Sequence, residues 1–142
     1  MINRKTDIQL VRRAFLLGIT GQRDLELHPK VGAWWEGYAV EEVLKALRPD
    51  EAYFWATHQG AELDLLLFKH GRRIGVECKR MDAPTLTPSM RITLEDLELD
   101  RLLVVYPGAR RYRLGDRVDV LPLVTLVAEG KDTEDVFKNR RR

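Results

Sequence analysis

The sequence predicts an α/β or α+β fold in which helices flank a mixed central β-sheet. Patterns typical of helices and strands follow one another along the 142 residues in the order helix, three strands, helix, and one or two strands. A chain of this length fits one domain with a single hydrophobic core. We therefore expect one domain over residues 1–142, in which a helical extension (1–27) precedes the core (28–127) and a basic tail (128–142) follows it.

Two segments before the strands have the apolar spacing of helices. Residues 5–18 repeat apolar side chains at helical intervals, and glycines end the pattern. Residues 31–47 are a stronger helix, because apolar side chains form one stripe along it. The stripe contains Val40, Val43, Leu44 and Leu47. Glu36 precedes Val40 by one turn and so lies on the core-facing side, where either the helix dipole or a functional partner would stabilise its charge.

The other elements follow from apolar runs and turn residues. A short aromatic strand is expected over 52–57, and a helix capped by Thr87 or Ser89 runs to about Leu97. Further strands are expected over 101–106 and 118–127, and Pro122 indicates an edge or a bulge in the second of them.

The most informative segment is a hairpin with strands at 62–68 and 73–79 around the turn His70-Gly71. In the register centred on this turn, paired positions sum to 141, so Asp64 faces Glu77 and Glu62 faces Lys79. Alternation places Leu63, Leu65, Leu67 and Cys78 on apolar faces and the charged residues on the opposite ones. Opposed carboxylates repel each other, and a bound cation would relieve that repulsion.

Composition narrows the class of protein. The net charge of +2 gives weak support for nucleic-acid binding, although arginines cluster near 72, 110 and 140. Such clusters are more typical of a solvated surface, but beside a carboxylate site they would hold phosphates. One cysteine excludes an internal disulfide. The sequence has neither an apolar run of the ~18 residues needed to span a membrane nor a signal-peptide core, so we expect a cytoplasmic protein without a membrane partner.

A nuclease motif coincides with the hairpin. Asp64, twelve further residues and then Glu77-Cys78-Lys79 match the PD-(D/E)XK pattern. The pattern alone is weak, because Asp116 and Glu129-Gly130-Lys131 match it as well. In that second copy the aspartate follows Gly115 in a turn, and the glutamate begins a loop. Only the first copy gathers its charges on one face of a predicted hairpin.

A larger resemblance runs from about residue 16 to residue 127. The chain resembles DUF4143, the C-terminal domain of a family of prokaryotic P-loop ATPases, and through it the PD-(D/E)XK nuclease-like superfamily. The matching stretches are His28-Pro29-Lys30-Val31-Gly32, Trp35-Glu36-Gly37, Tyr53-Phe54-Trp55, Gly60-Ala61-Glu62-Leu63-Asp64, Glu77-Cys78-Lys79-Arg80, Pro88-Ser89-Met90-Arg91 and Val105-Tyr106-Pro107-Gly108. The sequence lacks the P-loop pattern G-x-x-x-x-G-K-[ST], and Leu63 stands where the superfamily has its proline.

The resemblance implies a restriction-endonuclease-like core with Glu36, Asp64, Glu77 and Lys79 at the catalytic positions. Asp64, Glu77 and the backbone carbonyl of Cys78 would then bind Mg²⁺ or Mn²⁺, and Glu36 would reach a metal-bound water or a second ion. Lys79 would stabilise the charge that develops on the phosphate and help to orient or deprotonate the attacking water. The expected reaction is hydrolysis of phosphodiester bonds in DNA. Arg80 and Arg91 are candidates for binding phosphates, or are surface charges.

Several alternatives stay open at this stage. The domain would be catalytically silent if it serves only to bind a separate P-loop ATPase or nucleic acid. The charged residues of the hairpin would also suit an exposed cross-strand network of salt bridges. The aromatic residues, Trp34, Trp35, Tyr53, Phe54 and Trp55, are better assigned to a core than to base stacking. His58 and His70 lack partners at zinc-site spacing. A homodimer is plausible, as in related junction-cleaving enzymes.

Overall fold

The computed structural model describes residues 31–129, which form a mixed six-stranded sheet and, within that range, three helices. The elements are α3 (Val31–Leu47), β1 (Glu51–Ala56), β2 (Glu62–Lys69), β3 (Arg72–Cys78), α4 (Pro88–Asp96), β4 (Arg101–Tyr106), β5 (Tyr112–Gly115), β6 (Val118–Pro122) and α5 (Leu123–Ala128). The predicted α/β class and mixed sheet are confirmed. The helix expected over 5–18 and nearly all of the basic tail lie outside the described residues.

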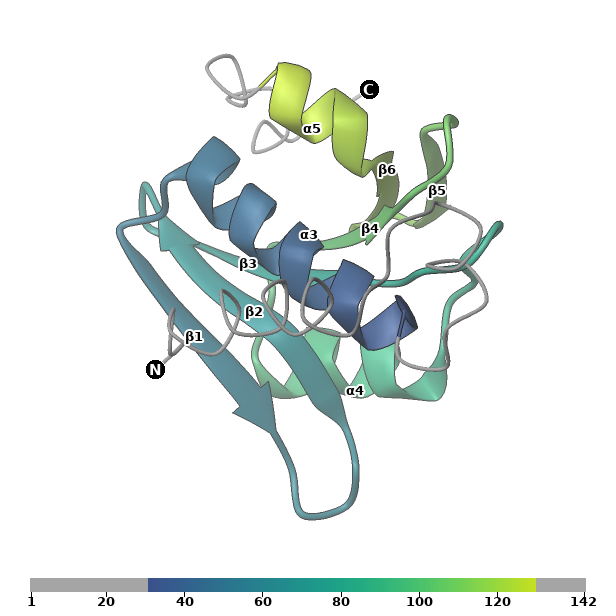
Figure 1. The fold of residues 1–142 in the computed structure, drawn as a ribbon. Coiled ribbons are helices and arrows are strands. Elements are labelled where there is room, and N and C mark those ends of the chain that lie inside the picture. Colours follow the sequence, from purple (N-terminus) through teal and green to yellow (C-terminus); the bar gives the residue numbers. More distant parts are fainter. Residues whose placement is uncertain (1–30, 130–142) are drawn as a thin grey trace.

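The sheet is antiparallel on one side of β3 and parallel on the other, except that the edge strand β5 pairs antiparallel with β6. Its strand order is β1-β2-β3-β4-β6-β5, in which β1, β2 and β3 pair antiparallel while β3, β4 and β6 are parallel to one another. Helices α3 and α5 cover one face of the sheet and α4 covers the other (Figure 1). Because β3, β4 and β6 run in the same direction, their C-terminal ends meet at one edge of the sheet.

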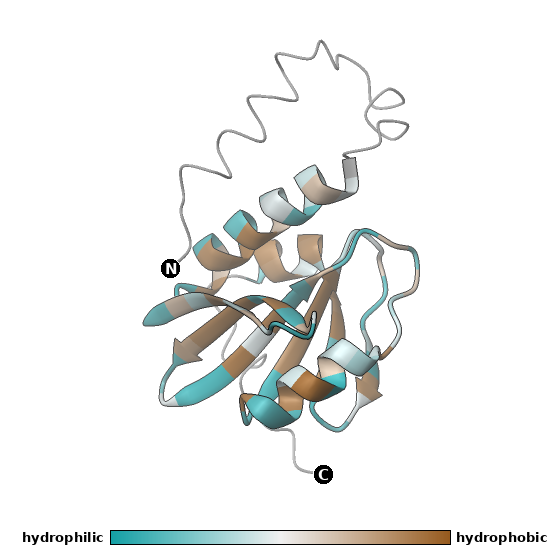
Figure 2. Ribbon diagram, turned by 90° about the horizontal axis from the view of Figure 1, so that it is seen from below, coloured by the Kyte–Doolittle hydropathy of each residue, from teal (hydrophilic) through white to brown (hydrophobic). Residues whose placement is uncertain are grey.

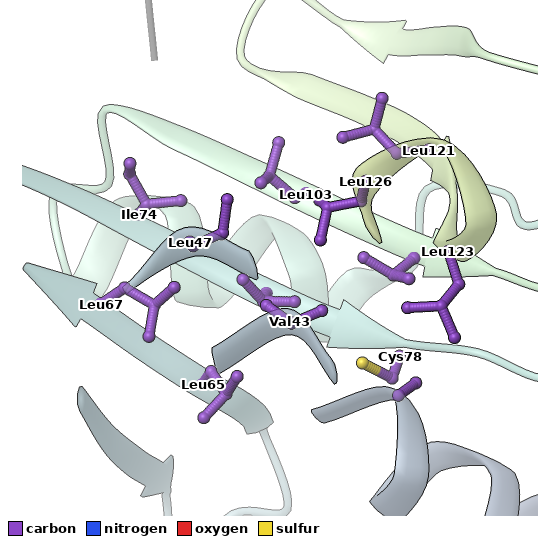
Figure 3. Close-up of a cluster of buried hydrophobic side chains, with 13 residues drawn as sticks. Val43, Leu47, Leu65, Leu67, Ile74, Cys78, Leu103, Leu121, Leu123 and Leu126 are labelled. Carbon is purple, nitrogen blue, oxygen red and sulfur yellow. The ribbon is translucent and has the colours of Figure 1, made fainter. Parts of the chain in front are cut away.

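Two apolar layers hold the helices to the sheet, and the central strands between them are almost wholly hydrophobic (Figure 2). In the first layer, Val43 and Leu47 of α3 pack with Leu65 and Leu67 of β2. Figure 3 shows this layer, with the sulfur of Cys78 among its aliphatic side chains. Cys78 is fully buried, as a packed small hydrophobic residue should be.

The second layer lies beneath α4. It contains Leu63, Met90, Leu94, Leu99, Leu102, Val104, Tyr106, Val118 and Val120. The side chain of Thr87 accepts a hydrogen bond from the N–H of Met90 and so caps α4, which confirms one of the two predicted caps. No helix within residues 31–129 is long and apolar enough to cross a membrane.

The predicted register of the hairpin is confirmed near its turn. Pairs from Leu65 and Val76 to Lys69 and Arg72 all sum to 141, and His70 and Gly71 have φ values of 50° and 73°. Two consecutive positive φ values are typical of the tight turns that join antiparallel strands. The ladder ends at Leu65, however, so the predicted pairings of Asp64 with Glu77 and of Glu62 with Lys79 are both wrong.

A bulge in β2 overturns the predicted alternation of its leucines. Tyr53 pairs with Leu66, but Trp55 pairs with Leu63, so β2 has one residue more than β1 over this stretch. The extra residue reverses the sides to which side chains point. Leu63 therefore packs beneath α4, whereas Leu65 and Leu67 pack beneath α3.

Two further predictions near the C-terminal end were wrong or incomplete. The strand expected over 118–127 ends at Pro122, and the remaining residues form the short helix α5. Leu123 and Leu126 of α5 are buried at helical spacing, while Val124 and Val127 are exposed. Strand β5, of only four residues, was not predicted.

Candidate functional site

The candidate site lies where β2 and β3 separate. Beyond the pair Leu65 and Val76 the two strands form no further ladder, and the carboxylate of Asp64 accepts a hydrogen bond of 2.7 Å from the backbone N–H of Cys78. On its other edge β3 continues to pair with β4, and the N–H of Lys79 donates to the carbonyl of Val105 at 2.8 Å. A carboxylate thus occupies the place of the missing strand neighbour.

Glu77 and Lys79 form an ion pair at this opening. Their Oε2 and Nζ atoms are 3.3 Å apart, and Glu77 is only 5% exposed. Burial, followed by repulsion from Asp64, raises the pKa of Glu77 from its ordinary value of 4.5 to about 7, even though Lys79 opposes the change. Burial disfavours the charged form of Lys79, but neighbouring carboxylates, Glu77 first, outweigh it and raise the pKa of the amine. Lys79 is therefore a cation at neutral pH.

Glu36 joins the cluster from the first turns of α3. Burial and then the charge of Asp64 raise its pKa, while Lys79 and a hydrogen bond from the backbone N–H of Arg80 act in the opposite direction. The pKa of Asp64 is also raised, mainly by burial, against the effects of the Cys78 N–H and Lys79. The structure thus brings the four predicted catalytic residues close enough for their charges to shift one another's pKa values.

The donor set suits a hard cation that keeps some of its water. Asp64 and Glu77 supply carboxylate oxygens, and the Cys78 carbonyl points to the same strand edge as its N–H, which is the edge of Asp64. Within residues 31–129, no three acidic, histidine or cysteine side chains cluster tightly enough to hold a metal by themselves. Two carboxylates with a carbonyl and water molecules fit Mg²⁺ or Mn²⁺, because Mg²⁺ usually retains several waters.

The two predicted phosphate-binding arginines lie outside the carboxylate cluster, and their guanidinium groups are not among the charges that shift its pKa values. Arg80 follows Lys79 directly, and its side chain is exposed. Arg91 lies in the first turns of α4 with its side chain also exposed, and its backbone N–H donates to the carbonyl of Thr87. Neither guanidinium group forms an ion pair with a carboxylate of the described residues.

The alternative of an exposed charge ladder does not match the structure. Glu62 makes no ion pair with any described residue, and its backbone pairs with Ala56 of β1. Glu77, in contrast, is buried. Burial of an acidic residue beside another acid is costly, so the cluster differs from a solvated network of surface charges.

The aromatic residues divide into two groups. Trp34 is buried, and Trp35 and Trp55 pack, partly buried, against the two apolar layers, as predicted. Tyr53 and Phe54 are 40% and 53% exposed on the edge strand β1, so their assignment to the core is wrong. His58 and His70 are exposed in turns outside the cluster. The sequence reasoning also missed Tyr106, whose hydroxyl holds the chain after β4 through both backbone groups of Arg110. Its signal was a tyrosine directly before Pro107-Gly108.

Comparison with known proteins identifies relatives and a family. Over 119 residues, the chain is 44% identical to the uncharacterized protein Rv2008c of Mycobacterium tuberculosis and equally to the uncharacterized protein Mb2031c of Mycobacterium bovis. These segments cover 84% of the chain but only 27% of either relative, so the chain spans about a quarter of their length. A family model described as a domain of unknown function, DUF4143, matches residues 31–126, which includes the entire carboxylate cluster. The chain belongs to the DUF4143 family.

Proposed function

We propose that this domain is a metal-dependent nuclease with a restriction-endonuclease-like core. The observation that carries the proposal is the buried pair of carboxylates, Asp64 and Glu77, which meets the cation of Lys79 where β2 and β3 separate. The order of elements supports it, since a helix, three antiparallel strands, a second helix and a parallel strand build this site. The residues match the PD-(D/E)XK pattern in the chemistry of their side chains and in their shared location.

Asp64, Glu77 and the Cys78 carbonyl would hold Mg²⁺ or Mn²⁺. When bound, such a cation supplies Lewis acidity that polarises a phosphoryl oxygen. A bound cation would offset the repulsion between the two carboxylates and lower their pKa values. The energy stored in their repulsion thus favours binding of a divalent ion.

The remaining side chains have distinct roles in the proposed reaction. Lys79, a cation at neutral pH, donates hydrogen bonds to a non-bridging oxygen of the scissile phosphate and so stabilises the charge that develops there. Glu36 is partly buried, and its raised pKa makes its carboxylate a stronger base, so that it suits a group that accepts a proton from water. Glu36 takes a proton from that water as its oxygen forms a bond to phosphorus, the bond from phosphorus to the leaving sugar oxygen breaks, and the leaving oxygen takes up a proton from solvent water.

A second function is supported by the edge strand β1. Tyr53 and Phe54 are exposed on a strand whose outer backbone edge has no neighbour within the described sheet. An open strand edge with apolar side chains is a ready site for another chain. This favours a docking role, for which a separately encoded P-loop ATPase and a second copy of the chain are the partners that the family resemblance suggests.

A cleavage assay separates the two functions. Single-stranded, double-stranded and branched DNA are incubated with the protein in Mn²⁺ or Mg²⁺, beside Asp64→Asn, Glu77→Gln and the control Glu95→Gln. Glu95 lies exposed on α4 and makes no ion pair with a described residue, so its loss should leave cleavage unchanged. The rate of cleavage should be at least about 100-fold lower in each site variant than in the wild type, because each variant lacks one of the proposed metal-binding carboxylates.

The outcomes are distinct. Cleavage that persists in both site variants would exclude this cluster as the active site. Absence of cleavage from every DNA, with the wild-type protein folded, would favour the docking function.

A further inference from the structure

We propose that residues 107–111, the loop between β4 and β5, form a rigid clamp that binds the phosphate backbone of nucleic acid beside the carboxylate cluster. The inference rests on the proposed function for the identity of the ligand. It adds a second binding element, from a different strand, to the residues of the motif.

The topology places this loop next to the site. Cys78 of β3 pairs with Val105 of β4 in parallel, and the N–H of Lys79 donates to the Val105 carbonyl. The next residue on β4 is Tyr106, so Lys79 and Tyr106 are neighbours at about the 4.8 Å spacing of adjacent strands. The loops that follow the two strands, 79–87 and 107–111, therefore leave from the same edge of the sheet.

Tyr106 fixes the backbone of the second loop. Its hydroxyl accepts a hydrogen bond of 2.9 Å from the N–H of Arg110 and donates one of 2.5 Å to the carbonyl of the same residue. Gly108 lies against the tyrosine ring so closely that a Cβ atom there would come within 2.1 Å of Cε2. The loop thus depends on a glycine and a buried tyrosine, and its position is set by β4.

A second tyrosine joins the two loops. The hydroxyl of Tyr112, the first residue of β5, donates a hydrogen bond of 2.7 Å to the carbonyl of Pro84, in the loop that begins with Lys79. The rings of Tyr112 and Tyr106 pack edge to face, with centroids 6.1 Å apart. The loop after β4 and the loop after β3 are therefore parts of one packed unit.

The charges on the two loops are mostly positive, and two of the arginines are exposed to solvent and to a ligand. Arg110 and Arg111 are exposed, and neither forms an ion pair with a carboxylate of residues 31–129. Arg113, two residues further, differs, because it contacts Asp119 and donates to the Asp116 carbonyl. Charged residues on the two loops are Lys79, Arg80, Asp82, Arg110 and Arg111, which gives four positive charges and one negative.

This arrangement favours a polyanion with evenly spaced charges. One guanidinium group can donate two parallel hydrogen bonds to two oxygens of a phosphate. The affinity of a protein for a nucleic-acid backbone depends on the number of phosphates that its cations neutralise. Arginines set beside a carboxylate cluster would hold a phosphodiester chain in place while a divalent ion offsets the repulsion between that chain and the carboxylates. Their backbone, already fixed by Tyr106, has little entropy to lose when they bind.

The test measures binding separately from cleavage. A fluorescent 30-base-pair duplex and its single strand are titrated by anisotropy at several salt concentrations, in EDTA and separately in Ca²⁺, with Arg110→Ala/Arg111→Ala and Arg110→Lys/Arg111→Lys. The matched control, Arg48→Ala/Arg72→Ala, also removes two positive charges. They lie after the C-terminal end of α3 and at the N-terminal end of β3, whereas the carboxylate cluster lies at the other end of each element. We expect the alanine variant to bind about 10- to 100-fold more weakly at low salt, with a log–log salt slope reduced by about 2, because each phosphate contact contributes about 0.9. The lysine variant should keep most of the slope, and the control should match the wild type.

The clamp would be overturned if the wild-type protein bound neither DNA, or if the alanine variant and the control lost the same affinity. It would also be overturned if the wild-type protein bound polyglutamate as tightly as DNA and the alanine variant lost affinity for both to the same extent. Circular dichroism and the melting temperature establish that each variant is folded. The clamp and the nuclease fail separately. Loss of binding in the alanine variant without any cleavage by the wild type would support the clamp alone, whereas cleavage by a protein whose binding is unchanged in that variant would support the nuclease alone.

Discussion

The backbone N–H of Cys78 donates a hydrogen bond of 2.7 Å to the carboxylate of Asp64 across the opening between β2 and β3. Elsewhere in the hairpin a backbone carbonyl of the neighbouring strand takes that place. The bond satisfies a buried strand N–H and at the same time fixes the orientation of an acidic side chain. Structure and chemistry therefore depend on the same two residues.

Replacement of Asp64 should separate these two roles. Asp64→Asn retains an oxygen that accepts from the Cys78 N–H, whereas Asp64→Ala leaves that N–H without a partner, at a cost of about 1–3 kcal/mol. The free energy of unfolding in urea at pH 8 should therefore be lower for the alanine variant than for the asparagine variant. Equal values for the two variants would show that the hydrogen bond does not contribute to stability.

Glu77 should make the empty protein less stable as the pH rises. Its pKa is about 7 in the folded state and near 4.5 in the unfolded chain, so between these values the folded state binds more protons. The free energy of unfolding from this group therefore falls as the pH increases from about 4.5 to 7 and is constant above that range. This fall in the free energy of unfolding is on the order of 1–3 kcal/mol, and it should be absent from the Glu77→Gln variant. Urea unfolding at pH 5, 6, 7 and 8 measures it. Glu95→Gln should retain the full pH dependence, and a loss in both variants would contradict the assignment.

A divalent ion should stabilise the protein, and more strongly at higher pH. Metal binding requires both carboxylates to be deprotonated, which the pKa of Glu77 opposes below about pH 7 and the raised pKa of Asp64 opposes in the same direction. At a concentration 100 times its dissociation constant, Mn²⁺ adds about 2.7 kcal/mol of stability. The melting temperature should rise with Mn²⁺ at pH 8, rise less at pH 6, and return on addition of EDTA. An equal rise in Asp64→Asn/Glu77→Gln would place the ion elsewhere.

Gly75 should not accept a side chain. A Cβ atom at this position would lie 2.6 Å from Cδ1 of Leu99 and 3.0 Å from Cδ1 of Leu102. Gly75→Ala should therefore lower the free energy of unfolding by about 1–3 kcal/mol through overpacking. Gly32→Ala is the control, because a Cβ atom in this helical position meets no atom within 4 Å and should be neutral or slightly stabilising. Leu99→Val, combined with Gly75→Ala, should restore part of the loss; no recovery would indicate a different cause.

The hydroxyl of Tyr106 should control the order of the loop after β4. Tyr106→Phe keeps the ring but removes both hydrogen bonds to Arg110, which contribute about 1–3 kcal/mol in total. We expect faster amide hydrogen exchange at Arg110 and unchanged exchange in the core strand β3. Tyr112→Phe, which loses the bond to Pro84, should instead affect residues 79–87. Unaltered exchange at Arg110 in Tyr106→Phe would show that the loop is fixed by other contacts.

Local sequence patterns predicted the parts of the fold that depend on neighbours in the chain. The register of the hairpin follows from its turn, because His70 and Gly71 adopt the positive φ values that join two strands tightly. The position of Glu36 on α3 follows from helical periodicity. Sequence patterns and the family resemblance together therefore predicted that four side chains lie close to one another: Glu36, Asp64, Glu77 and Lys79.

The parts that the sequence could not predict depend on distant contacts. The bulge in β2 arises from its pairing with β1, so the position of Leu63 beneath α4 is invisible to a rule of strict alternation. The run after Val118 is apolar throughout, and a strand cannot be told from a short helix there without knowing which side chains are covered. Burial of Glu77, which raises its pKa, likewise depends on distant contacts, among them its pairing with Val104 of β4.

The bulge has a consequence for changes of chain length. A single deletion between Leu63 and Leu66 would make the β1–β2 ladder regular and leave the neighbouring leucines on their present faces, but it would remove either Asp64 or the buried Leu65, whereas an insertion there would turn one half of the strand over. The exposed turn at 58–60, in contrast, has no buried side chain to misplace. Insertions and deletions should therefore accumulate at that turn among descendants of this sequence, whereas the length of the segment that bears Asp64 should stay fixed.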